Sequence, residues 1–205
     1  MLKRTFDIIC SGCVLILLAP VFLLLYIIIR KNLGSPVIFR QVRPGLFGKN
    51  FEMVKFRTMT SEVDMNGDLL PDSARLTNLG RFLRKTSLDE LPEMWNILKG
   101  DMSFIGPRPL LVRYMPYYTD EEHTRHNVRP GLTGLAQVAG RNLLTWEEKL
   151  ALDVHYVKHQ SIFMDLKILF RTFGVVMSRK GVLEGATQGP LDRYREKIKG
   201  GISGL

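Results

Sequence analysis

The sequence has few cysteines and fewer acidic than basic residues. Only two cysteines occur in 205 residues, and both, Cys10 and Cys13, lie within an apolar run. A redox or metal-binding C-x-x-C needs a polar, accessible setting, so we interpret this pair as small buried side chains and expect no disulfide framework. Lys and Arg number 29 against 20 Asp and Glu, which gives a formal net charge of +9. An anionic partner is therefore expected: a phosphate-bearing substrate, acidic lipid or nucleic acid.

Several common motifs are absent as well. The chain has neither a Walker loop nor a G-x-G-x-x-G after a predicted strand, so the usual nucleotide-binding folds lack support. No nucleic-acid reader module is present, and we expect no nucleic-acid partner. Two histidine pairs have the spacing of one helix face, but no third ligand accompanies either pair, which disfavours zinc. These pairs are His123 with His126 and His155 with His159.

The longest apolar run covers Ile8 to Ile29. At about 1.5 Å per residue it is long enough for a bilayer core of about 30 Å. Basic residues flank both ends, so the positive-inside rule does not orient a crossing. Ala19-Pro20 lies near the middle, where proline removes a helical hydrogen bond and bends the helix. Two interpretations stay open: a kinked span, and a helix that enters the membrane, breaks and returns.

Two strands are predicted after this run, Val37 to Gln41 and Phe51 to Met59. The segment between them, RPGLFGKN, is rich in turn residues and predicts a hairpin. Alternation along the second strand places Lys55 and Arg57 on one face. Two cations on one face are typical of a diphosphate site and equally of a solvated edge.

The segment Thr86 to Pro109, TSLDELPEMWNILKGDMSFIGPRP, carries the most chemistry. Asp89 and Glu90 lie at the expected N-terminus of a short helix, where the helix dipole favours ionised carboxylates. Such a pair suits Mg²⁺, which takes one or two carboxylates together with phosphate oxygens. Arg108 stands between two prolines that fix the backbone, and its guanidinium matches phosphate geometry. The combination predicts phosphoryl chemistry, although acidic first turns are also common without function.

Further candidates for phosphate or nucleotide binding flank this segment. A basic helix from Leu76 to Lys85 contains Arg84, which suits phosphate or lipid head groups. The glycine-rich HNVRPGLTGLAQVAGRN lets backbone approach a ligand closely, as an anion or a nucleobase edge requires. Its candidate side chains are Arg129, Gln137 and Arg141.

Two helices and a tail are expected in the last third. Trp146 to Lys158 predicts a helix in which Asp153 is either a further site carboxylate or a surface residue. Ser161 to Arg179 is apolar around much of its circumference, which indicates a helix that lies in the membrane interface or is buried. The segment after Gly181 is polar and glycine-rich, and predicts a flexible tail.

With these segments in view, the chain resembles the monotopic phosphoglycosyl transferases, the bacterial sugar transferase family that starts glycan assembly on polyprenyl phosphate. The resemblance extends from about Lys3 to Arg179. It rests on ordered signatures: KRTFDI before the apolar run, PVIFRQVRPGLFGKNFEMVKFRTM, SLDELPEMWNILKGDMSFIGPRPLL, and VRPGLTGLAQVAGRN followed by LDVHYV. Two departures are Ala19-Pro20, where members often have Ser-Pro, and Leu135, where an aromatic residue often stands.

The residues and the resemblance together predict a mostly helical α+β fold at the cytoplasmic face of the bacterial inner membrane. Residues 1–34 are expected to form a re-entrant membrane helix. Residues 35–180 are expected to form one catalytic domain with a small β-hairpin and amphipathic interfacial helices, and residues 181–205 a polar flexible tail.

The resemblance also implies a reaction. Asp89 attacks the sugar-linked phosphate of a UDP-sugar, UMP leaves, and undecaprenyl phosphate then takes the phosphosugar. Asp89 and Glu90 are the implied catalytic pair and ligands of Mg²⁺, and Arg108 is the first candidate for phosphate binding. Membrane lipid is a further expected partner, and a homodimer is left open. The alternative is a non-catalytic, membrane-bound basic adaptor of a glycan-assembly complex.

Overall fold

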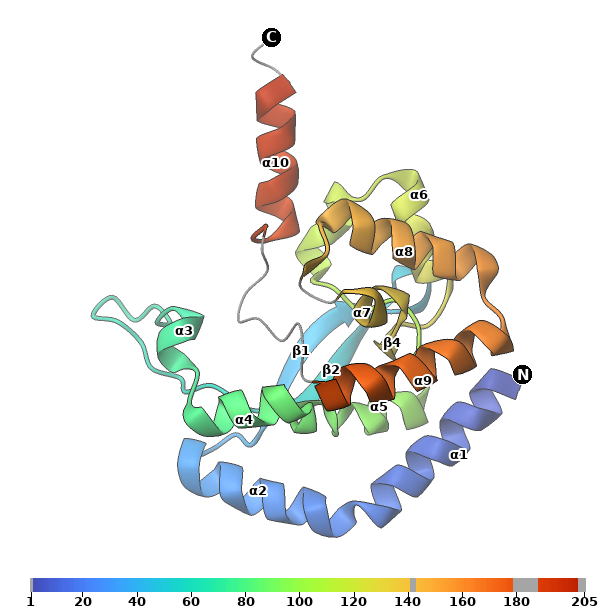
Figure 1. Cartoon of the computed structure of the whole chain (residues 1–205). Coiled ribbons are helices and arrows are strands. Elements are labelled where there is room, and N and C mark those ends of the chain that lie inside the picture. The colour runs from blue at the N-terminus through green and yellow to red at the C-terminus, as the bar shows by residue number, and fades with distance from the viewer. Residues whose placement is uncertain (1, 141–142, 179–187, 203–205) are drawn as a thin grey trace. The chain divides into compact units, whose positions relative to one another are not determined.

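The computed structural model describes residues 2–140, 143–178 and 188–202 (Figure 1). The chain divides into two compact units, which differ from the expected division at residues 34 and 180. The first consists of Met1–Gln41 with Met53–Lys99, and the second of Val42–Glu52 with Gly100–Leu205. The apolar N-terminal segment belongs to the first of these units together with residues 53–99.

The first unit is mostly helical. Its helices are α1 (Leu2–Leu17), α2 (Ala19–Leu33), α3 (Asp72–Arg75), α4 (Asn78–Thr86), the 3-10 turn η2 (Leu88–Glu90) and α5 (Glu93–Lys99). No single described helix is long and apolar enough to cross a bilayer, whereas α1 and α2 together are, with a bend of 62° between them. Ala19 and Pro20 are the first residues of α2, where a proline needs no N–H partner. The helix thus breaks where the sequence predicted, with Leu18 between the two arms.

One face of α1 is polar and packs on α5. Asp7 and Ser11 are buried on that face, and the Ser11 hydroxyl donates to the Asp7 carbonyl at 2.6 Å. The guanidinium of Arg4 donates to the carbonyls of Ile97 and Leu98 at 2.5 and 2.7 Å. These carbonyls belong to the last turn of α5, where a cation also offsets the helix dipole. The apolar arm is therefore fixed to the helix that follows the acidic pair.

The apolar core of the first unit joins α2, the hairpin base and α4. Its buried members are Leu25, Ile29, Val37, Phe56 and Leu83. Burying five such side chains contributes about 1.5–3 kcal/mol each relative to exposure. This core fixes α2 beside the segment that leads into the acidic pair.

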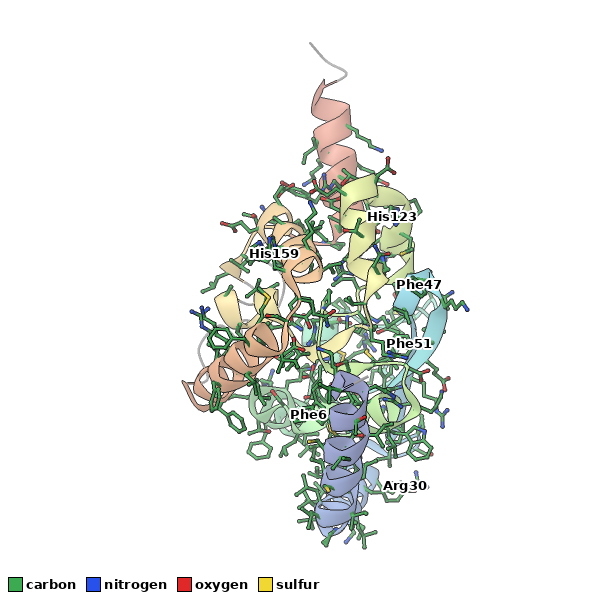
Figure 2. The ribbon with its side chains drawn as sticks, turned by 90° about the vertical axis from the view of Figure 1, so that its right-hand side faces the viewer. Phe6, Arg30, Phe47, Phe51, His123 and His159 are labelled. Carbon is green, nitrogen blue, oxygen red and sulfur yellow. The ribbon has the colours of Figure 1, made fainter. Side chains whose placement is uncertain are left out.

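The predicted hairpin is confirmed. It consists of β1 (Ile38–Pro44) and β2 (Asn50–Phe56), joined by the 3-10 turn η1 (Leu46–Gly48). Gly48 has a φ of 72°, a left-handed conformation that glycine adopts at little cost. Phe47, labelled in Figure 2, is 69% exposed at the turn. The turn residues predicted the hairpin correctly. The observed strand ends differ from the predicted ones by up to three residues.

The second unit contains a two-stranded parallel pair that the sequence did not predict. Strands β3 (Ser103–Ile105) and β4 (Gly131–Thr133) pair with Ser103 opposite Gly131. The surrounding helices are η3 (Val112–Tyr117), α6 (Asp120–His123), η4 (Thr124–Asn127), α7 (Leu135–Ala139), α8 (Trp146–His159), α9 (Ile162–Ser178) and α10 (Leu191–Ile202). Three-residue strands carry too little alternation to be recognised in a sequence.

Helix α9 is amphipathic, with one buried face and one exposed apolar face, and its position in a membrane interface stays a prediction. Asp165 and Ile168 are buried on its inner face. Its outer face exposes large apolar side chains over three turns. These are Ile162, Phe163, Leu166, Phe170 and Phe173.

The flexible tail expected over residues 181–205 needs correction for residues 191–202, because these form α10. Leu191 is fully buried beside Tyr114 and Trp146. The Tyr117 hydroxyl donates to Glu196 at 2.6 Å. The polar, glycine-rich composition predicted a flexible tail. It gave no sign that Leu191 would be buried and hold this helix against the rest of the second unit.

Candidate functional site

The acidic pair lies in η2, immediately after α4. Ser87 ends α4 with a φ of 57° and makes no side-chain capping bond. Helix α5 begins only at Glu93. The left-handed conformation of Ser87 therefore separates α4 from the turn that carries the acidic pair. Asp89 and Glu90 stand in a tight turn between these helices.

Two carboxylates, one from this turn and one from the start of α5, share the ammonium group of Lys55 on β2. Lys55 Nζ lies 2.8 Å from Glu90 Oε1 and 2.9 Å from Glu93 Oε1. Asp89 is 8% exposed and Glu93 is 3% exposed. We call Asp89, Glu90, Glu93 and Lys55 the carboxylate centre. It has more carboxylates than cations, which suits a nucleophile and a site for a further cation.

Glu93 of this centre and Asn96, three residues further along α5, were not among the residues predicted from the sequence. Trp95 is 56% exposed, whereas Glu93 and Asn96 are buried, so the inward side of α5 is partly polar. The Asn96 side-chain oxygen accepts from the Val54 amide at 3.1 Å, which fastens α5 to β2. The signal was present in the spacing, because Glu90, Glu93 and Asn96 recur every three residues.

The donor set of the acidic pair fits a hard divalent cation. Among the residues that the structure describes, no group of three or more His, Cys, Asp or Glu side chains forms a complete metal site. Mg²⁺ does not need one, since it commonly takes one or two carboxylates and fills the remaining positions with water and substrate phosphate. Asp89 and Glu90 would supply such a pair of oxygen ligands, and their role as magnesium ligands stays a prediction.

Arg57 and Arg84 hold neighbouring segments of the first unit. Arg57 donates to the carbonyls of Met59 and Ser35 at 2.8 and 3.1 Å. Arg84 Nε donates to the Thr58 hydroxyl at 3.1 Å. Both arginines thus have structural contacts, and phosphate binding by either one stays a prediction. Lys55 contacts carboxylates and is mostly buried, so it is not on a solvated edge, and phosphate binding by Lys55 stays a prediction.

In the second unit, the GPRP segment contains one exposed arginine between buried residues. Pro107 and Pro109 are buried, whereas Arg108 between them is exposed. A tight crossing of two chain segments lies behind it. A Cβ added to Gly131 would come within 2.1 Å of the Gly106 nitrogen, so only glycine permits this approach. The sequence prediction of a constrained arginine agrees with this geometry.

The other candidates in this unit have different surroundings. Arg129 Nε donates to the Gly100 carbonyl at 2.8 Å. Within the described ranges, neither amide atom of the Gln137 side chain has a hydrogen-bond partner, although both atoms are buried. Arg141 lies outside the described residues.

Asp153 is not a surface residue, and that alternative is wrong. It is 4% exposed, and its Oδ2 accepts from Arg125 Nη2 at 2.7 Å. Burial raises the pKa of the Asp153 carboxyl, while the Arg125 charge opposes this rise. The sequence analysis missed Arg125, whose 28-residue separation from Asp153 gives no local signal. We call Arg125 and Asp153 the buried pair.

Comparison with known proteins decides the family. A family model described as bacterial sugar transferase matches residues 1–179. The chain belongs to the bacterial sugar transferase family. The matched residues include the carboxylate centre, the GPRP segment and the buried pair, so all three lie in the part of the chain that defines this family.

Individual members of the bacterial sugar transferase family are also similar. The chain is 51% identical over 181 residues to an uncharacterized sugar transferase, EpsL, of Bacillus subtilis, covering 88% of this chain and 90% of that protein. It is 40% identical over 197 residues to undecaprenyl-phosphate galactose phosphotransferase of Salmonella typhimurium. That match covers 88% of this chain and 41% of the relative. The exopolysaccharide production protein ExoY of Rhizobium meliloti is 36% identical, with 88% of each chain covered.

Proposed function

We propose that this chain is a phosphoglycosyl transferase, which moves a sugar-1-phosphate from a UDP-sugar to undecaprenyl phosphate. The observation that carries the proposal is the carboxylate centre, where Glu90, the chain neighbour of Asp89, and Glu93 share the ammonium group of Lys55. The names of similar family members support the donor and acceptor. They include a UDP-glucose:undecaprenyl-phosphate glucose-1-phosphate transferase of Klebsiella pneumoniae, 42% identical over 182 residues.

Asp89 is assigned as the nucleophile. It is the residue that the family resemblance implies for this role, and its chain neighbour Glu90 is held, together with Glu93, by ion pairs to Lys55. Carboxylates are established covalent nucleophiles for phosphoryl groups. An Asp89 oxygen attacks the phosphorus that carries the sugar, and the bond from this phosphorus to the UMP oxygen breaks. An oxygen of undecaprenyl phosphate then attacks the same phosphorus and releases the Asp89 carboxylate.

Charge balance accounts for the remaining roles. The diphosphate is anionic, so a nearby carboxylate needs cations to accept it. Asp89 and Glu90 would hold Mg²⁺, which supplies positive charge at the phosphate oxygens when bound. Arg108 binds a donor phosphate through its exposed guanidinium fork. Glu93, buried against Lys55, holds that lysine in place.

The test is an Asp89→Asn variant assayed for UMP release with a panel of UDP-sugars, Mg²⁺ and undecaprenyl phosphate. The substitution keeps the size of the side chain and removes its nucleophilic charge, so turnover should fall by at least about a thousandfold, or roughly 4 kcal/mol of barrier. Asp120→Asn is the matched control, because Asp120 is an exposed acid in the first turn of α6. Release of UMP at the wild-type rate by Asp89→Asn would contradict the assignment.

The covalent step has its own measurement. Wild-type protein incubated with UDP-sugar and Mg²⁺ but no acceptor should gain the mass of one phosphosugar. Adding undecaprenyl phosphate should remove that mass, and Asp89→Asn should never acquire it. Full turnover by a wild-type enzyme that forms no adduct would favour direct transfer between the two substrates.

We also propose that α1 and α2 enter and leave the cytoplasmic leaflet on the same side. The outward faces of this bent pair expose large apolar side chains, which lipid would cover. Among them are Ile9, Ile16, Leu17, Leu23 and Leu24. In the second unit, the exposed aromatic face of α9 suits the membrane interface in the same way.

Accessibility labelling tests this topology. Tags placed at Met1 and at Ser35, the residues that flank the bent pair, should both react only from the cytoplasmic side. Labelling of Met1 from the periplasmic side would establish a crossing. A tag after Ile202 on α10 serves as the cytoplasmic reference.

A further inference from the structure

Arg108 is exposed, whereas the residues on either side of it are buried. The buried neighbours are Ile105, Gly106, Pro107 and Pro109. Two further backbone hydrogen bonds extend the pairing with β4 past the end of β3. Gly106 N donates to the Thr133 carbonyl at 2.9 Å, and Gly131 N donates to the Pro107 carbonyl at 2.9 Å. Strand pairing therefore fixes the chain up to Pro107, one residue before Arg108.

Two arginine side chains hold the next two carbonyls. Arg125 Nη2 donates to the Arg108 carbonyl at 2.7 Å. Arg43 Nη1 donates to the Pro109 carbonyl at 3.3 Å. A short bond from a charged donor is stronger than a long one, so Arg125 makes the more important of these contacts. The peptide that leaves Arg108 is thus set by the position of the Arg125 guanidinium.

Asp153 sets that position in turn. Arg125 Nε and Nη2 both bond Asp153 Oδ2, at 3.2 and 2.7 Å. Arg125 is 3% exposed and Asp153 4% exposed, so water does not screen the pair. The ring of Tyr118 lies 5.6 Å from the Arg125 Cζ on another side. Arg125 Nη2 serves two acceptors at once, the Asp153 carboxylate and the Arg108 carbonyl.

We propose that Arg125, oriented by Asp153, is a positioning residue for donor binding. It fixes the Arg108 peptide and so directs the exposed Arg108 guanidinium toward the diphosphate. The inference rests on the proposed function, in which Arg108 binds a donor phosphate. A guanidinium fork matches two phosphate oxygens only in a narrow range of orientations. Loss of the bond to the Arg108 carbonyl weakens donor binding without removing any group that touches the donor.

The test replaces the buried pair by apolar residues of similar volume, Arg125→Met with Asp153→Leu. Such replacement of a buried ion pair is often neutral or stabilising, so the double variant is expected to fold. It keeps the packing and removes the donor to the Arg108 carbonyl. The KM for UDP-sugar and the Kd for UDP should each rise about tenfold, while kcat changes less, because a small misplacement of a binding group is costly. Lys158→Met is the control, since it removes an exposed ion pair from the same helix, α8.

A coupling measurement separates positioning from general support. In an Arg108→Ala background, removal of the buried pair should cause no further rise in KM or Kd, because the side chain to be positioned is gone. An equal rise in both backgrounds would overturn the proposal, as would a folded double variant with unchanged KM and Kd. Should the double variant not fold, Arg125→Lys keeps a cation opposite Asp153 but has no planar fork. It should raise KM with the same dependence on Arg108, and unchanged KM would overturn the proposal.

The two proposals fail differently. A wild-type protein that releases no UMP from any UDP-sugar contradicts the transferase function. Calorimetry with UDP alone then still reports whether Arg108 and Arg125 are coupled in diphosphate binding.

Discussion

The carboxylate centre and the buried pair both join acids to a base, but they differ in balance. In the buried pair one guanidinium meets one carboxylate, and both side chains are almost inaccessible. In the carboxylate centre Lys55 serves Glu90 and Glu93, and Asp89 adds a third acid beside them. A closed one-to-one pair has no capacity for a ligand. The four residues of the carboxylate centre include three acids, which suit a further cation as ligands, and we expect this difference to separate a reacting centre from a supporting one.

The largest expected effect comes from removing only one member of the buried pair. Arg125→Met alone leaves the Asp153 carboxylate buried without its cation. The free energy of unfolding should fall by about 3–5 kcal/mol, whereas the double replacement with Asp153→Leu should recover most of it. Denaturant unfolding in detergent measures both. A single variant as stable as the double variant would mean that water reaches Asp153, and the contrast between the two centres would then weaken.

Much of the carboxylate centre could be predicted from the sequence, because its signals are local. Asp89 and Glu90 are adjacent, and the break at Pro20 and the hairpin turn at Gly48 follow from single residues with strong backbone preferences. Such preferences act within a few residues and need no knowledge of the fold. The family resemblance added the reaction, which residue types alone did not specify.

The buried pair could not be predicted in this way. Arg125 and Asp153 meet across 28 residues, and either one would pass for a surface charge by composition. Lys55 was placed correctly on its strand, but its partners Glu90 and Glu93 come from another element. Charge pairing at long range depends on packing that periodicity does not encode. The docking of α10 through Leu191 was missed for the same reason.

An effect of intermediate size is expected when the stability of the protein is measured as a function of pH, because His126 lies beside the buried pair. His126 is 6% exposed beside Arg125, and burial followed by the Arg125 charge lowers its pKa from 6.5 to about 4. The unfolded chain therefore binds a proton at His126 below pH 6.5 that the folded chain refuses until about pH 4. Stability should be full above pH 6.5 and should fall as the pH drops toward 4, by about 2–3 kcal/mol.

His126→Gln should remove this part of the pH dependence. His155→Gln is the control, because His155 is exposed on α8. Melting temperatures between about pH 7 and about pH 4.5 measure the difference. Equal slopes for the wild-type protein and His126→Gln would show that His126 ionises freely and that its surroundings are open to water.

The smallest expected effect is a loss of stability on removing the one lysine of the carboxylate centre. Lys55→Met leaves Glu90 and Glu93 without their shared ammonium, and loss of a charged hydrogen-bond partner there should cost about 1–2 kcal/mol. Because negative charge then accumulates, Mg²⁺ should bind the variant and raise its melting temperature by mass action more than it does for the wild-type protein. Lys158→Met removes an exposed pair with Glu121 and should lose under about 1 kcal/mol, with no response to Mg²⁺. If Mg²⁺ stabilises Lys55→Met and Lys158→Met equally, the carboxylate centre has no special affinity for a divalent cation, and the metal-ligand role of Asp89 and Glu90 is wrong.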